Sequence, residues 1–415
     1  MYISKIDIRN IRSLKEFTME FPKGNEAGWH VLIGDNGSGK SSIVRCIAAA
    51  LIGPNEIGAL RQYWDEWLSQ GADTGGVELA IIDGKRDQLT LPFNIKVKCS
   101  FELERDADGV VLHSVTDTRR NVISEKGRSQ PNNYFSASFG PFRRFTGGSS
   151  EWSKVYRSAP NAGAHLSVFG EDVALTEAME WLKELDRRRL KEKESSDKQP
   201  SRSAYIFDKL RDFINTSKLL PHNTVFTGIN LDGEPEFRDG NGSIVRITQL
   251  SDGYRSILSM TFELIRQLAL RSYSIFDVPG VVLIDEIDAH LHPTWQTRIG
   301  EWFTRHFPKI QFIVTTHSPL ICRACENGTI WRLSAPGSGQ PSGELTGPQR
   351  DRLIYGNILD AYGTQVFGSD TSRSDVGNRK FNRLAELNMK SITGLITEEE
   401  EVEYNRLQSI FSSGK

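Results

Sequence analysis

The N-terminal part of the chain shows the alternation of apolar and polar residues that is typical of half-buried strands. Residues 2–22 contain two such segments around a turn, and residues 76–116 alternate again in VELAII, LTLPFNIKVKCSFELE and GVVLHSV. A period of two in short segments predicts a small antiparallel β subdomain. Between these regions the apolar strand Trp29–Ile33 leads into GDNGSGKS and then into the apolar helical stretch SSIVRCIAAALIG.

The middle of the chain changes to helical periodicity. Residues 171–194 have a helical pattern, and the polar break SSDKQPSRS separates them from a second helix at about Ala204–Leu219. Two helices joined in this way predict a short helical hairpin inserted into the fold. Strand-like segments return at Thr224–Phe237 and Ser243–Thr248.

From Leu250 onward helical and strand patterns alternate. A helix over Ser251–Arg271 precedes the apolar strand Gly280–Ile284, and a helix over His292–Phe307 precedes the strand Ile310–Thr316. This order predicts an α/β fold with a parallel sheet.

The C-terminal region has a different composition. The stretch APGSGQPSGELTGPQ at 335–349 is rich in Pro, Gly and Ser, which predicts a linker. The tail from 350 to 415 is polar and helical in pattern. Thr397 with Glu400 three residues later fits a capping box, which predicts the start of a helix.

The composition excludes several classes of protein. The 415 residues carry a net charge of −2, with 38% hydrophobic and 25% charged residues, so the whole chain is not a basic nucleic-acid binder. No apolar run approaches the roughly 18 residues of a membrane helix, and the N-terminus has no apolar signal core. Four cysteines in a chain of this length do not form a disulfide scaffold, which favours the cytoplasm.

The segment from Gly34 to Ser41 fits the phosphate-binding pattern GxxxxGK[ST] at every required position. Glycines let backbone N–H groups surround phosphate oxygens, and the following helix N-terminus adds partial positive charge. A flexible Gly/Ser turn is the alternative, but the strand before the loop and the helix after it favour the phosphate site. The residues predicted to bind nucleotide here are Gly34, Asn36, Gly37, Gly39, Lys40, Ser41 and Ser42.

The apolar strand Val281–Ile284 ends in two acids, Asp285 and Glu286. We expect Asp285 and Ser41 to hold Mg²⁺ and Glu286 to orient or deprotonate the attacking water. Two solvated acids at a strand end would be an equal alternative if the phosphate loop were absent.

Together these motifs resemble the ABC-ATPase superfamily, and specifically its SMC/RecF-like branch. The sequence Leu250-Ser-Asp-Gly-Tyr254 is similar to the LSGGQ signature, with Asp252 and Tyr254 as departures. The resemblance implies that Ser251 and Gly253 contact the γ-phosphate bound by the opposite subunit. Further implied positions are the D-loop residue Asp288, the switch histidine His317 as a catalytic residue, and Arg12 as a nucleotide contact.

The resemblance implies an α/β fold of the ABC/SMC-type P-loop NTPase head, with an antiparallel β subdomain, a short helical insertion and a helical C-terminal tail. We expect the following division: 1–170 as the N-terminal half of the head, 171–222 as the insertion, 223–334 as the C-terminal half, and 350–415 as a tail for oligomer or partner contacts. The insertion has room only for a short arm, which excludes cohesin-like architecture.

Several other features are less informative. The glutamine that the family places after an early strand has no match in the segment 134–143, and Gln130 lies in a polar loop. Cys322 and Cys325 lack a second pair for a zinc site, so a structural pair is favoured. The basic run 187–191 is interspersed with acids, so a solvated helix face is favoured over phosphate contacts. His290 and His292 flank Leu291 in the D-loop, where we expect an interface rather than a metal.

At the level of biological role, the compact head and the tail 367–374 resemble the stand-alone ATPases of bacterial antiphage systems of the Septu (PtuA-like) kind. This resemblance implies ATP and Mg²⁺ as cofactors, a homodimer or higher even-numbered oligomer, and a separate HNH-type nuclease partner. The alternative is a RecF-like clamp that binds DNA across an ATP-dependent dimer. An ABC transporter subunit is a third reading, which the N-terminal motif and the altered signature disfavour.

Overall fold

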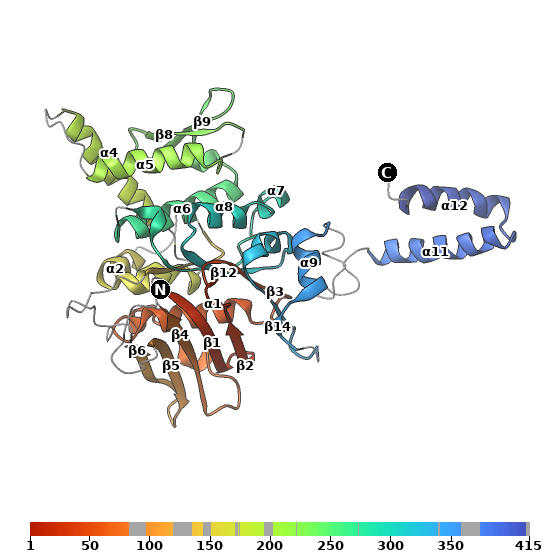
Figure 1. Cartoon of the computed structure of the whole chain (residues 1–415), viewed down its shortest axis with the longest axis horizontal. Coiled ribbons are helices and arrows are strands. Elements are labelled where there is room, and N and C mark those ends of the chain that lie inside the picture. Colours follow the sequence, from red (N-terminus) through yellow and green to blue (C-terminus); the bar gives the residue numbers. More distant parts are fainter. Residues whose placement is uncertain are drawn as a thin grey trace. The chain divides into compact units, whose positions relative to one another are not determined.

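The structure is a computed structural model of the chain, and it divides into two compact units, Met1–Ile354 and Tyr355–Lys415, each described by itself. The residues that the structure describes are 1–82, 97–118, 135–143, 151–170, 173, 175–194, 202–220, 222–272, 274–338, 341–357 and 374–411. Figure 1 shows the arrangement of the elements.

The predicted antiparallel subdomain is confirmed as a five-stranded sheet in the order β2-β1-β4-β5-β6. All neighbouring strands in this sheet run antiparallel. Its strands are β1 (Tyr2–Ile11), β2 (Leu14–Glu20), β4 (Thr74–Ile82), β5 (Val97–Arg105) and β6 (Val110–Asp117). In β2 the buried Phe17 and Met19 alternate with exposed polar residues, as a period of two requires.

A second sheet of six strands forms the α/β core, in the order β14-β13-β3-β12-β11-β7. All pairs are parallel except β13 with β14. Its strands are β3 (Gly28–Gly34), β7 (Phe135–Phe139), β11 (Gly280–Ile284), β12 (Ile310–Thr316), β13 (Ile330–Leu333) and β14 (Gly343–Glu344). Because parallel strands end at one edge, the segments after β3, β7, β11 and β12 come together there.

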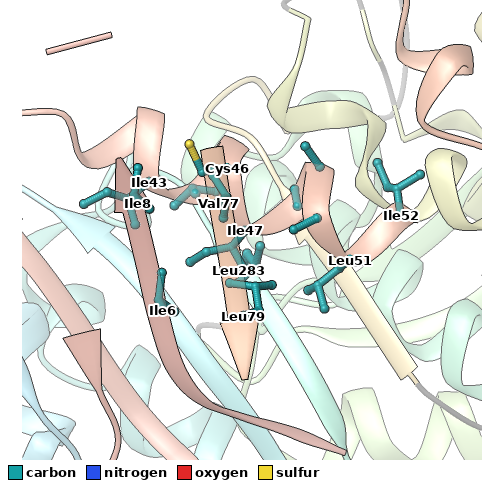
Figure 2. Packing of buried hydrophobic residues seen from close by; sticks show 14 of the residues in the cluster. Ile6, Ile8, Ile43, Cys46, Ile47, Leu51, Ile52, Val77, Leu79 and Leu283 are labelled. Atoms are coloured by element: carbon teal, nitrogen blue, oxygen red, sulfur yellow. The ribbon is translucent and has the colours of Figure 1, made fainter. Parts of the chain in front are cut away.

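Helix α1 (Lys40–Ile52) packs against strands of both sheets. Nearly every side chain on it is buried, which explains why its sequence is apolar all round. Figure 2 shows part of this packing: Ile43 and Ile47 of α1 belong to one buried cluster with Ile8 and Val77 of the antiparallel sheet and Leu283 of β11. The main core of the first unit therefore fixes the helix that begins at the phosphate loop.

A smaller lobe contains the predicted helical hairpin. Its helices α4 (Thr176–Glu194) and α5 (Arg202–Thr216) pack on each other and on the sheet β10-β9-β8. The strands of this sheet are β8 (Val225–Ile229), β9 (Pro235–Arg238) and β10 (Ile244–Arg246). Helix α6 (Asp252–Ala269) packs against α4 and against β7, so it connects this lobe to the core sheet.

The prediction of one helix over His292–Phe307 is wrong, because two helices occupy this range. They are α7 (Pro293–Gln296) and α8 (Ile299–His306). At the junction the Thr297 hydroxyl donates to the carbonyl oxygen of Thr294 at 2.8 Å, a side-chain bond that competes with regular helix bonding. The remaining helices are α2 (Trp152–Ser158), α3 (Pro160–His165) and α9 (Gly347–Tyr355), with 3₁₀ turns η1 (Ile57–Leu60), η2 (Trp64–Glu66), η4 (Leu166–Val168), η5 (Ile247–Gln249), η6 (Ile275–Asp277) and η7 (Pro319–Asn327).

The linker predicted at 335–349 is only partly a linker. Within it β14 pairs with β13, and the Leu345 N–H donates to the carbonyl oxygen of Ile330 at 2.8 Å. The Pro/Gly/Ser content therefore marks the turns around an edge strand rather than a boundary between units.

The described part of the second unit contains a helical hairpin. It contains α11 (Asp375–Ile392) and α12 (Glu398–Phe411), which pack through buried Leu387 and Leu407. The predicted capping box is confirmed, because Thr397 and Glu400 exchange reciprocal side-chain to backbone hydrogen bonds of 3.3 Å. The segment 367–374, on which the sequence resemblance of the tail rests, lies outside the described residues apart from Ser374.

Candidate functional site

The glycine loop lies between β3 and α1, where close approach of the backbone excludes larger residues. A Cβ at Gly34 would lie 2.3 Å from the carbonyl oxygen of Leu333. Gly39, which precedes α1, has a φ of 96°, and a Cβ there would lie 2.9 Å from the side chain of Leu14. The two positions are therefore restricted to glycine by packing and by backbone conformation.

Lys40 begins α1 and folds back over this loop. Its Nζ donates to the carbonyl oxygens of Gly34 at 2.7 Å and Asp35 at 2.8 Å. Burial lowers the pKa of Lys40 from the usual 10.5 to about 8, against the opposing effect of the nearby acids. The ammonium group is thus held in a partly desolvated position, where its attraction to phosphate would be strong.

Ser41 and Asp285 meet across the core, 244 residues apart in sequence. The Ser41 hydroxyl donates to Asp285 Oδ1 at 3.1 Å, and the Thr315 hydroxyl donates to the same oxygen at 2.5 Å. Asp285 is almost fully buried at the end of β11. A hydroxyl and a carboxylate oxygen at this spacing are ligand types that suit Mg²⁺.

Glu286 follows Asp285 and has a left-handed backbone conformation, with a φ of 47°. Its N–H donates to the Thr315 hydroxyl at 2.8 Å, and its carbonyl oxygen accepts from Arg143 Nη2 at 2.9 Å. A non-glycine residue in this region is strained, and both of its peptide groups are held by partners. The turn directs the Glu286 side chain into the cavity described below.

His317 follows β12 and is half-buried. Burial, together with the nearby charge of Lys40, lowers the pKa of His317 from its ordinary value. Its two neighbours in sequence are anchored: the Thr316 hydroxyl donates to Asp288 Oδ1 at 2.5 Å, and the Ser318 hydroxyl donates to Gln296 Oε1 at 2.7 Å. The backbone on both sides of the imidazole is therefore held by side chains of the segment after β11.

These elements surround one cavity of about 300 Å³. It is lined by Arg12, Ser13, Asn36, Gly37, Gly39, Lys40, Ser41, Ser42, Glu286 and His317. Arg12 lies beside the loop with its guanidinium over the ring of Trp67, 5.3 Å from the ring centroid. The structure thus brings together predicted residues from four separated segments of the chain.

The signature segment lies elsewhere. Ser251 precedes α6, is exposed, and makes no side-chain capping bond. A Cβ at Gly253 would lie 2.5 Å from the carbonyl oxygen of His290, so this glycine packs against the D-loop of its own chain. Neither Ser251 nor Gly253, both within the described residues, lines the cavity.

Two residues of this site had no role in the sequence-based prediction. Arg143 is buried after β7, and Thr315 bonds both acids. Thr315 stands in the histidine motif and Arg143 ends the segment that lacks the family's glutamine, but only the folded contacts show what they hold. Gln130 lies outside the described residues.

The less informative features have structural explanations. Cys322 and Cys325 lie in η7, and burial raises the pKa of both thiols. Among the described residues no cluster of three His, Cys, Asp or Glu side chains is arranged to hold a metal. In α4 the exposed Arg187 and Arg188 pair with Glu184 of the same helix, which supports a solvated face there, whereas Arg189 is mostly buried against Asp186 and the ring of Phe207. His292 caps α7 through Thr294.

Comparison with known proteins decides the family. The family described as "AAA domain, putative AbiEii toxin, Type IV TA system" matches residues 30–323, and an AAA ATPase domain family matches residues 1–53. The chain belongs to this AAA-domain family. The match includes the phosphate loop, the acidic strand and the histidine segment, and membership supports nucleotide binding at the cavity.

Curated relatives extend the similarity over most of the chain. The Septu protein PtuA of Bacillus mycoides (strain KBAB4) is 28% identical over 383 residues, which cover 90% of this chain and 44% of that protein. The retron Ec83 probable ATPase of Escherichia coli is 44% identical over 98 residues, 23% of this chain and 18% of that protein. The predicted resemblance to PtuA-like proteins is confirmed. The chain spans less than half the length of these curated relatives.

Among solved structures, an SMC head bound to the C-winged helix domain of ScpA aligns with 84% of this chain and 99% of that chain, at 17% identity and a TM-score of 0.46. The SMC head domain from Thermotoga maritima gives 15% identity and a TM-score of 0.41.

In the described part of the chain, no helix combines the length and the apolar composition needed to cross a membrane.

Proposed function

We propose that the protein binds and hydrolyses ATP with Mg²⁺ and that its complete sites form between two copies of the chain. The observation that carries this proposal is the cavity, in which Lys40, Ser41, Glu286 and His317 lie around one glycine loop. The loop N–H groups and Lys40 would bind the phosphates, with Arg12 as a further nucleotide contact.

The oxygen ligands fit a magnesium ion. Ser41 Oγ and Asp285 Oδ1 lie 3.1 Å apart at the start of α1, and Thr315 fixes the carboxylate. Mg²⁺ keeps several waters and uses few protein ligands, so this small set is sufficient. When bound, the ion would neutralise phosphate charge, while Glu286 orients or deprotonates the attacking water and His317 contacts the γ-phosphate.

The signature residues motivate the dimer. Ser251 and Gly253 stand at a helix N-terminus outside the cavity, a position suited to a phosphate held by another molecule. ATP that contacts both copies would favour the closed dimer, and loss of phosphate after hydrolysis would favour opening. We place Asp288 on the same surface, because the carbonyl oxygen of His290, two residues further along, lies close to Gly253.

At the level of biological role, we propose a regulatory ATPase subunit of an antiphage defence complex in the bacterial cytoplasm. The similarity to Septu PtuA over 90% of the chain supports this role. Residues 1–170 and 223–334 would form the two halves of the ATPase head, 171–222 a short arm, and 350–415 the contacts to an HNH-type nuclease or to an even-numbered oligomer. Surfaces outside the nucleotide core are the natural place for such contacts.

The test is a mass measurement by light scattering of the full chain, with and without MgATP, alone and co-expressed with its neighbouring gene product, together with an ATPase assay. ATP turnover and an even-numbered oligomer that retains a nuclease would support the proposal. A protein that dimerises only with ATP and then binds duplex DNA without a partner would instead favour the RecF-like alternative. Absence of ATP turnover in every state would overturn the enzymatic part.

A further inference from the structure

Arg143 is a buried arginine at the junction of the core sheet and the signature helix. It follows β7, and only 5% of its surface is exposed. Burial lowers the pKa of Arg143 to about 10, which leaves the guanidinium charged at neutral pH. A buried charge is expensive unless its donors are used, so the partners of this side chain indicate what it holds in place.

The three nitrogens of the guanidinium donate hydrogen bonds to oxygen atoms of three different residues. Nη1 donates to the carbonyl oxygen of Asp285 at 3.1 Å, and Nη2 donates to that of Glu286 at 2.9 Å. Nε donates to the hydroxyl of Ser256 at 3.0 Å. Ser256 lies in α6, one turn after the signature residues, so one planar group joins the two acids to the signature helix.

These bonds fix the conformation of Glu286. Its left-handed φ of 47° is held by Thr315 on the N–H side and by Arg143 on the carbonyl side. A change in either contact would let the peptide rotate and move the carboxylate away from the cavity. Thr315 belongs to the rigid sheet, whereas Arg143 is also bonded to a helix that lies outside the sheet.

The turn after β7 that leads to Arg143 is itself held by hydrogen bonds. The Gly140 N–H donates to the Ser167 hydroxyl at 3.2 Å, and that hydroxyl donates to the carbonyl oxygen of Ser138 at 3.0 Å. Arg45 of α1 donates through Nε to the carbonyl oxygen of Val168 at 2.7 Å, so the phosphate-loop helix braces the same turn. A displacement of α6 would therefore be felt at Glu286 rather than absorbed by the loop after β7.

We propose that Arg143 is a positioning residue that transmits the placement of the signature helix α6 to Glu286. The inference rests on the proposed ATPase function. When a partner's nucleotide draws the N-terminus of α6 into contact, Ser256 and Arg143 would carry that displacement to the backbone of the two acids and so adjust the direction of the Glu286 carboxylate. Arg143 contacts no substrate in this scheme.

The experiment compares Arg143→Lys, Ser256→Ala and the double variant in the full-length protein. Lysine keeps the charge but cannot reach three acceptors as a planar fork. We expect kcat to fall roughly 10- to 100-fold in Arg143→Lys, with Kd for ATP within about twofold of the wild type, because the geometry of the water-activating group is lost. Ser256→Ala should lower kcat less, and the double variant should match Arg143→Lys, since both act through one contact.

Two controls separate positioning from general damage. Arg266→Lys changes a second largely buried arginine, which lies in α6 and pairs with Glu263, and should leave kcat unchanged. In a Glu286→Gln background, Arg143→Lys should cause no further loss of the residual rate. Equal losses in Arg266→Lys, or an unchanged kcat in Arg143→Lys, would overturn the proposal.

Hydrogen exchange provides a readout that does not need turnover. In nucleotide-free protein, Arg143→Lys should speed exchange both in the peptide that contains Asp285 and Glu286 and in the first turns of α6. Unchanged exchange in either peptide would overturn the coupling, even if the ATPase is active. A wild type without ATPase activity would overturn the proposed function, while the exchange result would still decide whether Arg143 joins α6 to the acids.

Discussion

The glycine loop and the signature segment are both short motifs beside a helix N-terminus, but they differ in how complete they are within one chain. The loop packs under Leu14, Lys40 bonds back to it, and Asp285 meets Ser41 across the sheet. At the signature segment, Ser251 is exposed and its side chain caps nothing.

The phosphate loop and the signature segment depend on different surroundings. A loop between a buried strand and a buried helix is fixed by the core of its own chain, so its geometry exists before any ligand arrives. The signature helix is fixed along its buried length, whereas Ser251 and Asp252 at its start are exposed. Substitutions in the two regions should therefore separate into effects on a single chain and effects on the assembly.

The largest expected effect concerns the acid that belongs to the loop side. Glu286→Gln should lower kcat by about 10²–10⁴-fold, the usual contribution of a general base, while ATP binding persists. The ATP-dependent dimer should then accumulate, because hydrolysis no longer releases it. Steady-state kinetics and light scattering with MgATP measure both. Hydrolysis by this variant at the wild-type rate would contradict the assignment of Glu286.

The next effect compares the two regions directly. Lys40→Ala should raise Kd for ATP about 10- to 100-fold, the loss expected for a charge-assisted phosphate contact. Ser251→Ala should leave binding to the single chain unchanged and abolish only the ATP-dependent dimer. Calorimetric titration at low protein concentration gives the first quantity, and light scattering gives the second. Equal losses of nucleotide affinity in both variants would contradict the conclusion that Ser251 acts only in the assembly.

The ease of predicting these regions from sequence follows the same division. The phosphate loop and the strand Gly280–Ile284 are local patterns, and the structure has them where the sequence predicted them. Contacts that join distant segments could not be read from the pattern: Arg143 reaches residues 113 and 142 positions away. The break between α7 and α8 was missed because apolar periodicity continues through it, while a threonine hydroxyl interrupts the backbone bonding.

A third prediction uses the pKa of Lys40, about 8 instead of 10.5. At pH 7 the Lys40 ammonium is charged in the folded and in the unfolded protein, and its burial destabilises the folded state. Between pH 8 and 10.5 the unfolded state binds more protons than the folded state, so stability rises with pH relative to a variant without this group. Relative to Lys40→Met, the free energy of unfolding of the wild type should rise by about 1–2 kcal/mol between pH 7 and pH 10, after solvent screening is allowed for.

Urea unfolding of the nucleotide-free proteins at the two pH values measures this difference, and subtraction of the variant removes the titration of other groups. A matched control is Lys23→Met, which changes an exposed lysine and should show no such pH dependence. If the gap between wild type and Lys40→Met stays constant from pH 7 to pH 10, the ammonium is not desolvated and the loop is less enclosed than the structure shows.

The smallest effect sharpens the description of the signature side. Trp295 Nε1 donates to the Tyr254 hydroxyl at 2.9 Å, and the rings make an edge contact at 6.1 Å. Tyr254→Phe keeps the ring contact but leaves the indole N–H without this acceptor, so it should destabilise the chain by about 0.5–1.5 kcal/mol in urea unfolding. Tyr63→Phe, at a residue with 79% exposure, should leave the free energy of unfolding unchanged.

The ATP-dependent dimer should survive in Tyr254→Phe, because the bond lies within one chain. Its loss would show that Tyr254, a departure from the usual signature, orients Ser251 and Gly253 for the partner, and that the signature side depends on its own chain more than its exposure indicates.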